Sequence, residues 1–220
     1  MVSDMRCVVI GGGPAGRAAA MELAALDMDV MLVEKKLIGG TCLNEGCMVV
    51  CGLNDVARFL EEARQLSDLG VLDVECSADY RSIAGGVKRT LERIRHVTER
   101  ETLDAGIEIV YGVAEFEDDR LLVEGEELDY DRLIIATGAS PLIPPIEGAS
   151  KAITYRDILD LDGIPDKLVI IGGGVIAAEF AGIFSSFGSE VTVVSRSGFL
   201  SKLDPLIRDY VSEKVLSDVR

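Results

Sequence analysis

The chain has 220 residues and a mass of 23.6 kDa, enough for one large domain or two small ones. Apolar residues make up 48% of it, and acidic residues outnumber basic ones by 38 to 22, for a net charge of −16. This composition excludes intrinsic disorder and argues against a nucleic-acid partner, which would need a basic surface. We interpret the acids, many of them between Glu99 and Asp131, as a solvated face; a salt-rich host or repulsion of anionic partners is the alternative.

No segment predicts export or a membrane span. Residues 1–6 lack the charged and apolar regions of a signal peptide. The longest apolar run, residues 168–178, is closed by Glu179 and is too short to cross a bilayer. The chain has five cysteines, three of them clustered, which is typical of redox or metal chemistry in a reducing compartment. We therefore expect a cytoplasmic protein without a membrane partner.

The chain repeats itself. Residues 7–35, CVVIGGGPAGRAAAMELAALDMDVMLVEK, match residues 168–196, LVIIGGGVIAAEFAGIFSSFGSEVTVVSR, at a constant offset without a gap. Each copy contains an apolar strand, a glycine turn, a helix and a second strand, the opening βαβ unit of a doubly wound nucleotide-binding fold. The sequence therefore predicts an α/β protein with two Rossmann-like units.

Several elements are expected between the two copies. They are a loop entering a helix over 41–69, a long helix with a Gly85-Gly86 flaw over 76–104, a strand over 107–111, an antiparallel β-meander over 113–130, a buried strand over 133–136 and a short helix over 157–161. Prolines and Gly148 mark a crossover between domains. A last helix is expected over 204–218, so the second unit reads as βαβα and lacks the third strand of a complete half.

The first glycine motif is Gly11-x-Gly13-x-x-Gly16. Gly11 permits the tight turn, Gly13 lets the backbone approach a pyrophosphate, and Gly16 lets helix and strand pack closely. The pyrophosphate would lie at the helix N-terminus, where free N–H groups and the helix dipole favour anions. Glu34, at the end of the second strand, would accept hydrogen bonds from a ribose hydroxyl. Three further residues are expected at this site: Pro14, Ala15 and Lys35.

The second motif is Gly172-x-Gly174-x-x-Ala177, and alanine is tolerated at its third position. Ser195 stands where Glu34 stands in the first copy, and Arg196 follows it. Loss of the acid removes the ribose acceptor for NAD, while an arginine can pair with a 2′-phosphate. The motif favours NADPH over NADH, the alternative being that Arg196 is a solvated loop residue. Two neighbours complete the expected site: Val175 and Ile176.

Cys42 and Cys47 lie in the segment GGTCLNEGCMVVC. In a regular helix their Cα atoms would be about 8–9 Å apart, whereas a disulfide needs roughly 4.4–6.8 Å. A bridge therefore requires a distorted turn, which Gly46 permits. A thiol near a helix N-terminus also has its thiolate stabilised. Two cysteines without a redox role fit these residues equally well.

The segments GGGPAG, GGTCLNEGC, ATGASP and GGGVIAAEFA, with Glu34 after the first, occur in the order of the flavoprotein disulfide reductases. The chain resembles this family over nearly its whole length, and most of all the N-terminal portion of dihydrolipoamide dehydrogenase. The resemblance implies an FAD-binding domain over 1–148 and a partial NAD(P)-binding domain over 149–220. Electrons would pass between NAD(P)H, FAD and a Cys42–Cys47 disulfide.

In the family the first cysteine exchanges with a small-molecule or protein-bound disulfide substrate and the second contacts the flavin. The resemblance assigns these roles to Cys42 and Cys47, and implies a homodimer for the full-length protein. It also adds residues to the FAD site: Gly40, Thr41, Ala114, Ala136, Thr137 and Gly138.

The chain departs from the family pattern at Cys51, which stands where the family has a lysine paired with the acid at Glu179. We expect Glu179 to be protonated, paired with another cation, or rotated into water. Cys51 could be a relay thiol or a metal ligand, but a small buried hydrophobe is the favoured interpretation. His96, the only histidine, is expected on a helix surface.

The later Gly-Asp flavin motif and the dimer-interface domain of the family are absent from these residues. We therefore expect a fragment of a larger protein, with weak or no disulfide reductase turnover on its own. The alternative is a non-catalytic flavin- or nucleotide-binding subunit completed by a partner chain. A thiol–metal protein is a third and weaker hypothesis.

Overall fold

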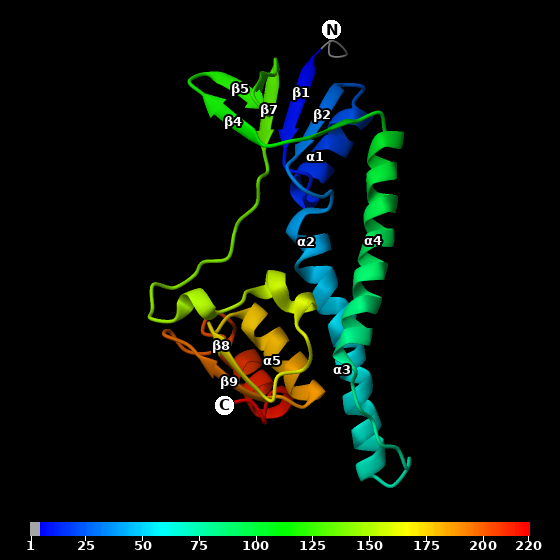
Figure 1. Cartoon of the computed structure of the whole chain (residues 1–220), viewed down its shortest axis with the longest axis vertical. Helices are drawn as coiled ribbons and strands as arrows, with labels where there is room; N and C mark the ends of the chain where they lie inside the picture. Colours follow the sequence, from blue (N-terminus) through cyan, green and yellow to red (C-terminus); the bar gives the residue numbers. More distant parts are fainter. Residues whose placement is uncertain (1–4) are drawn as a thin grey trace. The chain divides into compact units, whose positions relative to one another are not determined.

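The computed structural model describes residues 5–220. It is a mixed α/β structure with parallel sheets (Figure 1). Residue contacts divide it into two compact units: unit 1 is Met1–Val49 with Lys88–Ile158, and unit 2 is Val50–Val87 with Leu159–Arg220. The domain boundary between residues 148 and 149 stays a prediction.

The centre of unit 1 is a four-stranded parallel sheet in the order β3-β2-β1-β7. Its strands are β1 (Arg6–Ile10), β2 (Asp29–Glu34), β3 (Glu108–Tyr111) and β7 (Arg132–Ile135). The expectation that the strand near residues 133–136 is buried is wrong, because β7 is the last strand of this sheet and Ile135 is 62% exposed. All four strands run in one direction, so their carboxyl ends meet at one edge of the sheet.

Alternating side chains of β1 and β2 build two cores, one on each face of the sheet. Cys7, Val9 and Leu32 face helix α1 (Pro14–Ala25), which packs on one side. On the other face, Val8 and Ile10 pack against the antiparallel sheet β4-β5-β6. This alternation follows from the period of two in a β-strand. Unit 1 therefore has three layers, with α1 and the antiparallel sheet on opposite faces of the parallel sheet (Figure 1).

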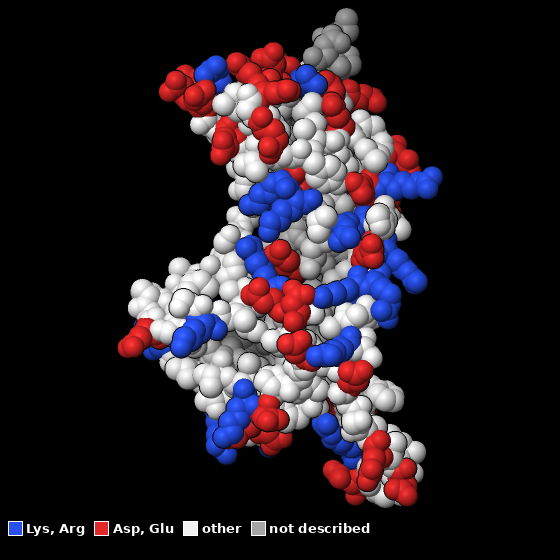
Figure 2. Space-filling view, in the orientation of Figure 1, with Lys and Arg blue, Asp and Glu red and all other residues white. Residues whose placement is uncertain are grey.

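The antiparallel sheet consists of β4 (Ala114–Glu117), β5 (Arg120–Val123) and β6 (Glu126–Glu127). The acidic side chains of this segment are exposed, and they gather over the β4–β5 hairpin in Figure 2. The acids between Glu115 and Asp131 therefore form the solvated face that the sequence predicts.

Two helices stand where the sequence predicts a loop entering one helix. They are α2 (Gly40–Asn44) and α3 (Cys47–Asp68), interrupted at Glu45 and Gly46. The next helix, α4 (Tyr80–Asp104), runs without a break through Gly85 and Gly86, since helical glycine is tolerated at a cost of about 1 kcal/mol.

Unit 2 contains the second βαβ segment: β8 (Lys167–Ile171), α5 (Val175–Phe187) and β9 (Glu190–Val194), with the two strands paired in parallel. Tyr80 packs against Phe184 and Phe187 of α5, with ring centroids 5.9 and 6.2 Å away. These rings form an aromatic core within unit 2.

Short helical turns complete the chain. They are η2 (Ala149–Lys151), η3 (Tyr155–Asp160), α6 (Pro205–Tyr210) and the π-helical turn η4 (Val211–Val215). The single helix expected over 204–218 is thus two shorter pieces, the first capped by Asp204, which accepts a hydrogen bond of 2.9 Å from the Leu206 N–H. The backbone of Arg220 bonds to Val191 and Val193 of β9. In residues 5–220, no helix is long and apolar enough to span a membrane.

Candidate functional site

A cavity of about 570 Å³ lies in unit 1 at the carboxyl ends of its parallel strands, a size in the range of small-molecule and cofactor sites. Ligands of doubly wound sheets bind at this edge, where the strand order reverses; here the reversal is between β2-β1 and β7. Most of the first-unit residues predicted from the sequence line it: Gly11, Gly13, Pro14, Ala15, Glu34, Lys35, Gly40, Thr41, Cys42, Ala114, Ala136, Thr137 and Gly138.

The glycine turn between β1 and α1 has the close packing that the motif predicts. Gly11 has φ +106°, and a Cβ there would lie 2.3 Å from the Ala136 carbonyl oxygen. A Cβ on Gly16 would lie 1.9 Å from the Gly11 carbonyl oxygen, so Gly16 packs helix against strand and does not line the cavity. Larger residues at either position would force the backbone apart.

Gly13 is the N-cap of α1, and no side chain caps this helix end. A Cβ on Gly13 would meet only the Cα of Gly40, at 3.8 Å. The N-terminus of α1 therefore faces the cavity, and no side chain blocks it at Gly13. Its free N–H groups favour binding of an anion at this position. This arrangement fits the pyrophosphate of a dinucleotide.

Glu34 is 7% exposed, and both of its carboxylate oxygens accept backbone hydrogen bonds. One accepts from the Gly12 N–H at 2.7 Å and the other from the Lys36 N–H at 2.8 Å. A carboxylate has about four acceptor positions, so two remain for ribose hydroxyls. The sequence predicted the ribose role; the role of Glu34 in holding the glycine turn was not predicted.

The residues that come directly after β3 in the chain form another wall of the cavity. The Gly112 N–H donates to the Glu34 carbonyl oxygen at 3.0 Å, and the Val113 N–H donates to the Glu124 carboxylate at 2.6 Å. Next to them, the Tyr111 hydroxyl donates to Glu99, and burial together with this carboxylate raises the pKa of Tyr111. Ala114 follows these hydrogen-bonded residues and lines the cavity.

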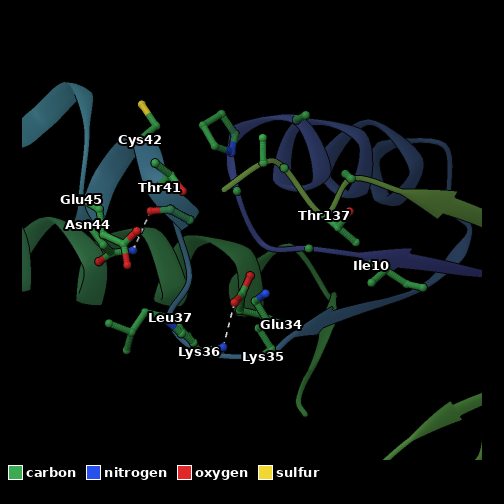
Figure 3. A pocket seen from close by; sticks show the side chains of 18 of the residues that line it. Ile10, Glu34, Lys35, Lys36, Leu37, Thr41, Cys42, Asn44, Glu45 and Thr137 are labelled. Carbon is green, nitrogen blue, oxygen red and sulfur yellow. Dashed lines mark hydrogen bonds between the residues drawn. The ribbon is translucent and has the colours of Figure 1, made fainter. Parts of the chain in front are cut away.

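Asn44, at the end of α2, was missed by the sequence reasoning. Its side-chain amide donates to the carbonyl oxygens of Ile38 and Gly40, both at 3.0 Å, and accepts from Arg95 at 3.3 Å. These bonds hold the loop at Gly39 and Gly40, whose φ values are +94° and +54°. Figure 3 shows Asn44 beside Thr41 at the cavity. An amide shortly after the cysteine of GGTCLN was the available signal.

The two candidate redox cysteines lie on successive helices. Cys42, on α2, is half-buried and lines the cavity, whereas Cys47 begins α3, is exposed, and does not line it. No disulfide joins them. The helix is interrupted between them at Glu45 and Gly46.

Cys51 is exposed on α3. The favoured interpretation of Cys51 as a small buried hydrophobe is therefore wrong, because this face of α3 points outward. Within residues 5–220, no group of three or more His, Cys, Asp or Glu side chains could hold a metal ion. His96 is exposed on α4, as predicted.

The second glycine motif has a similar local geometry. Gly172 has φ +131°, and Gly174 caps α5 without a side-chain bond. A Cβ on Gly173 would lie 2.5 Å from the Ser195 hydroxyl oxygen, and that hydroxyl donates to the Gly198 carbonyl at 2.9 Å. Ser195 therefore lies beneath this turn, as Glu34 does in unit 1.

Other residues predicted for the second motif differ in exposure. Val175, Ile176 and Arg196 are exposed, whereas Ala177 is buried against the sheet. Glu179 is exposed to water, which is one of the three states expected for it.

The chain matches the family described as Pyridine nucleotide-disulphide oxidoreductase over residues 5–218. It belongs to this family. It is 37% identical to an uncharacterized protein of Methanocaldococcus jannaschii, covering 97% of this chain and 51% of the relative. It is 34% identical to the dihydrolipoyl dehydrogenases of Acholeplasma laidlawii and Bacillus subtilis, covering 94% and 86% of this chain and 65% and 43% of theirs.

A solved structure of the HOCl-induced flavoprotein disulfide reductase RclA from Escherichia coli superposes with a TM-score of 0.80 at 30% identity. The match covers 97% of this chain and 48% of RclA. The chain therefore spans about half the length of most of these relatives.

Proposed function

We propose that this chain binds FAD in the cavity of unit 1 and transfers electrons between a nicotinamide nucleotide, the flavin and the Cys42/Cys47 pair. The observation that carries the proposal is that one cavity is lined by the α1 N-terminus, by Glu34 and by Cys42. A helix end suited to an anion, a carboxylate suited to ribose hydroxyls and a thiol therefore lie at one edge of one sheet.

Each part of the cavity has a distinct task in this proposal. The N–H groups at the start of α1 bind the pyrophosphate, with Gly13 and Gly40 leaving room for it. The free acceptor positions of Glu34 bind the adenosine ribose, and the backbone at Ala114 faces the adenine. When bound, FAD supplies the hydride and electron-transfer chemistry, and the protein supplies orientation.

The cysteine pair would provide the exchangeable dithiol. In this proposal Cys42 exchanges with a small-molecule or protein-bound disulfide and Cys47 makes the flavin contact. Exchange proceeds through attack of a thiolate on a disulfide sulfur, which releases the other sulfur as a thiolate. Single Cys42→Ser and Cys47→Ser variants separate the two roles. Cys47→Ser should abolish a thiolate-to-flavin absorption band, whereas Cys42→Ser should retain it.

The second glycine motif would bind the nicotinamide nucleotide, with preference for NADPH. The exposed Arg196 follows Ser195, and the motif has no acid at that position to bind a ribose 2′-hydroxyl. Arg196→Ala should weaken binding of NADPH about tenfold and leave binding of NADH unchanged. Equal losses for both nucleotides would contradict this assignment.

Most of the relatives that the chain matches are about twice its length, so the complete activity belongs to a larger protein in this proposal. We propose that it is a cytoplasmic homodimer and that these residues alone turn over a disulfide substrate weakly or not at all.

The decisive experiment is a visible spectrum of the purified chain before and after addition of dithionite and NADPH. Flavin bands that bleach with both reagents are expected. A colourless protein that takes up no added FAD would overturn the proposal. Flavin that NADPH never reduces would favour a nucleotide-binding subunit completed by a partner chain.

A further inference from the structure

The turn between the two cysteines carries an acid, Glu45. It follows α2 and precedes α3, so it lies between Cys42 and Cys47 in the chain. Its N–H donates to the Thr41 carbonyl oxygen at 2.9 Å, which fixes the backbone of the turn. Glu45 precedes Gly46 in the segment GGTCLNEGC, and no role was predicted for it from the sequence.

Arg156 provides a cation for this acid from a distant part of the chain. Its Nε lies 2.8 Å from Glu45 Oε2, and the two side chains are only 32% and 26% exposed. The guanidinium also donates to the Ala139 carbonyl oxygen at 3.5 Å and lies 5.9 Å from the centroid of the Tyr155 ring. Partial burial strengthens the attraction between these charges compared with a fully exposed pair.

The segment that carries Arg156 is itself held in place. The Asp157 carboxylate accepts hydrogen bonds from the Thr154 N–H at 2.8 Å and from its hydroxyl at 3.0 Å, and these bonds lower the pKa of Asp157. The Arg156 N–H donates to the same hydroxyl at 3.3 Å. The backbone of Arg156 is therefore ordered by local bonds, and its side chain reaches the cysteine turn from a fixed point.

The ion pair belongs to the same cavity as Cys42. Glu45, Arg156, Tyr155 and Ala139 all line it, and Figure 3 shows Glu45 on the same side of the cavity as Cys42. The other charged residues that line this cavity are Glu34, Lys35 and Lys36. Glu34 already accepts backbone bonds with both oxygens, so Arg156 and Glu45 are the charged pair at the cysteine turn.

Glu45 lies three residues after Cys42 and two residues before Cys47 in the chain. A carboxylate close to a thiol opposes the formation of its thiolate, because like charges repel. A cation on that carboxylate cancels most of this effect. We infer that Arg156 is a positioning residue that acts through Glu45. It ties the turn between Cys42 and Cys47 to the wall of the cavity and keeps an acid from suppressing the thiolates. This inference rests on the proposed function of the cysteine pair as the exchangeable dithiol.

The test measures alkylation of Cys42 and Cys47 by iodoacetamide in the reduced chain at pH 7, with each cysteine followed by mass spectrometry of its peptide. In this reaction the thiolate sulfur forms a bond to carbon and iodide leaves, so the rate follows the thiolate. Arg156→Gln should slow both cysteines about threefold to tenfold. Arg156→Lys should restore most of the rate, since it keeps the charge.

Removing the acid provides the complementary variant. Glu45→Gln should react at least as fast as the unmodified chain, and the double variant Glu45→Gln/Arg156→Gln should match Glu45→Gln. If the ion pair only held the turn in place, both single variants and the double variant would instead react more slowly to the same extent. Arg120→Gln is the matched control, because its partner Glu117 lies 2.6 Å away in an exposed pair on the antiparallel sheet; it should leave both rates unchanged.

Two results would overturn the inference: unchanged rates in Arg156→Gln, or a double variant as slow as Arg156→Gln. If Arg156→Gln fails to fold by circular dichroism, a Glu45→Gln chain that reacts more slowly than the unmodified one would overturn it as well. The proposed function is checked separately, by whether Cys42 and Cys47 form a disulfide in glutathione buffers. Absence of that disulfide would end the proposed function, while the alkylation rates would still decide the role of the ion pair.

Discussion

The carboxylate of Glu34 accepts a hydrogen bond of 2.7 Å from the backbone N–H of Gly12, which joins the end of β2 to the glycine turn after β1. Its second oxygen accepts from the Lys36 N–H at 2.8 Å. Glu34 thus links two walls of the cavity before any ligand binds. A residue chosen from the sequence as a ligand for ribose is also part of the support of its own site.

Glu34→Gln should therefore lower the free energy of unfolding of the ligand-free chain, and it should also lower the affinity for FAD. A glutamine has one acceptor oxygen, so one of the two backbone N–H groups would face an amide NH₂ group. A buried donor without an acceptor costs about 1–3 kcal/mol. Urea titration of the ligand-free chain should show a loss of that size, and Glu126→Gln, at an exposed position on β6, should show none. Equal stability of the two variants would contradict the structural role of Glu34.

Gly13 and Gly16 should respond differently to alanine. A Cβ on Gly16 would lie 1.9 Å from the Gly11 carbonyl oxygen, whereas one on Gly13 would lie 3.8 Å from its nearest neighbour, the Cα of Gly40. Gly16→Ala should destabilise the chain by about 1–3 kcal/mol or more, the range for overpacking. Gly13→Ala should leave the midpoint of thermal unfolding nearly unchanged and reduce FAD affinity at least about tenfold, because its methyl group points to where a pyrophosphate approaches. A Gly13→Ala chain that binds FAD normally would place the pyrophosphate elsewhere.

The local repeats of this chain could be predicted because their causes are local. The glycine turns at Gly11 and Gly172, with φ of +106° and +131°, depend on residues close together in the sequence. In these places residue type and spacing are sufficient to predict the backbone. The helix break at Glu45 and Gly46 was expected only if Cys42 and Cys47 form a disulfide, and the elements predicted from the sequence did not include it.

The remaining features depend on residues that are far apart in the chain. Asn44 bonding to Arg95 and Glu45 pairing with Arg156 arise only after α2, α4 and η3 have packed. The exposure of Cys51 likewise depends on which face of α3 is covered, and the short apolar run around it gave no such information. Sequence reasoning located the cavity, but it could not identify the ion pair beside the cysteines.

Thiol reactivity should rank the cysteines by exposure. Cys47 and Cys51 are exposed, whereas Cys7 is 2% exposed in the core of β1, where burial raises the pKa of its thiol. At pH 7 we expect iodoacetamide to modify Cys47 and Cys51 at least about tenfold faster than Cys7. In urea the three rates should converge, which serves as the control. Rapid modification of Cys7 in the folded chain would show that β1 opens on the timescale of the reaction.

The stability of unit 2 should fall at alkaline pH because of Tyr80. This side chain is 2% exposed between Phe184 and Phe187, and burial raises its pKa to about 12, compared with about 10 in an unfolded chain. A raised pKa means that the neutral phenol is favoured in the folded state. Its contribution is complete below about pH 10 and is lost as the pH rises toward 12, by at most about 1.4 kcal/mol per pH unit.

Tyr80→Phe keeps the ring and removes the ionisable group, so its free energy of unfolding should fall less steeply between pH 10 and 12. Urea titrations at several pH values would measure the two slopes. Tyr210→Phe is the control, because Tyr210 is 63% exposed on α6 and its hydroxyl remains in water in the folded state; its slope should equal that of the unmodified chain. If Tyr80→Phe loses stability as steeply as the unmodified chain, the alkaline transition is due to other groups and Tyr80 is not its cause.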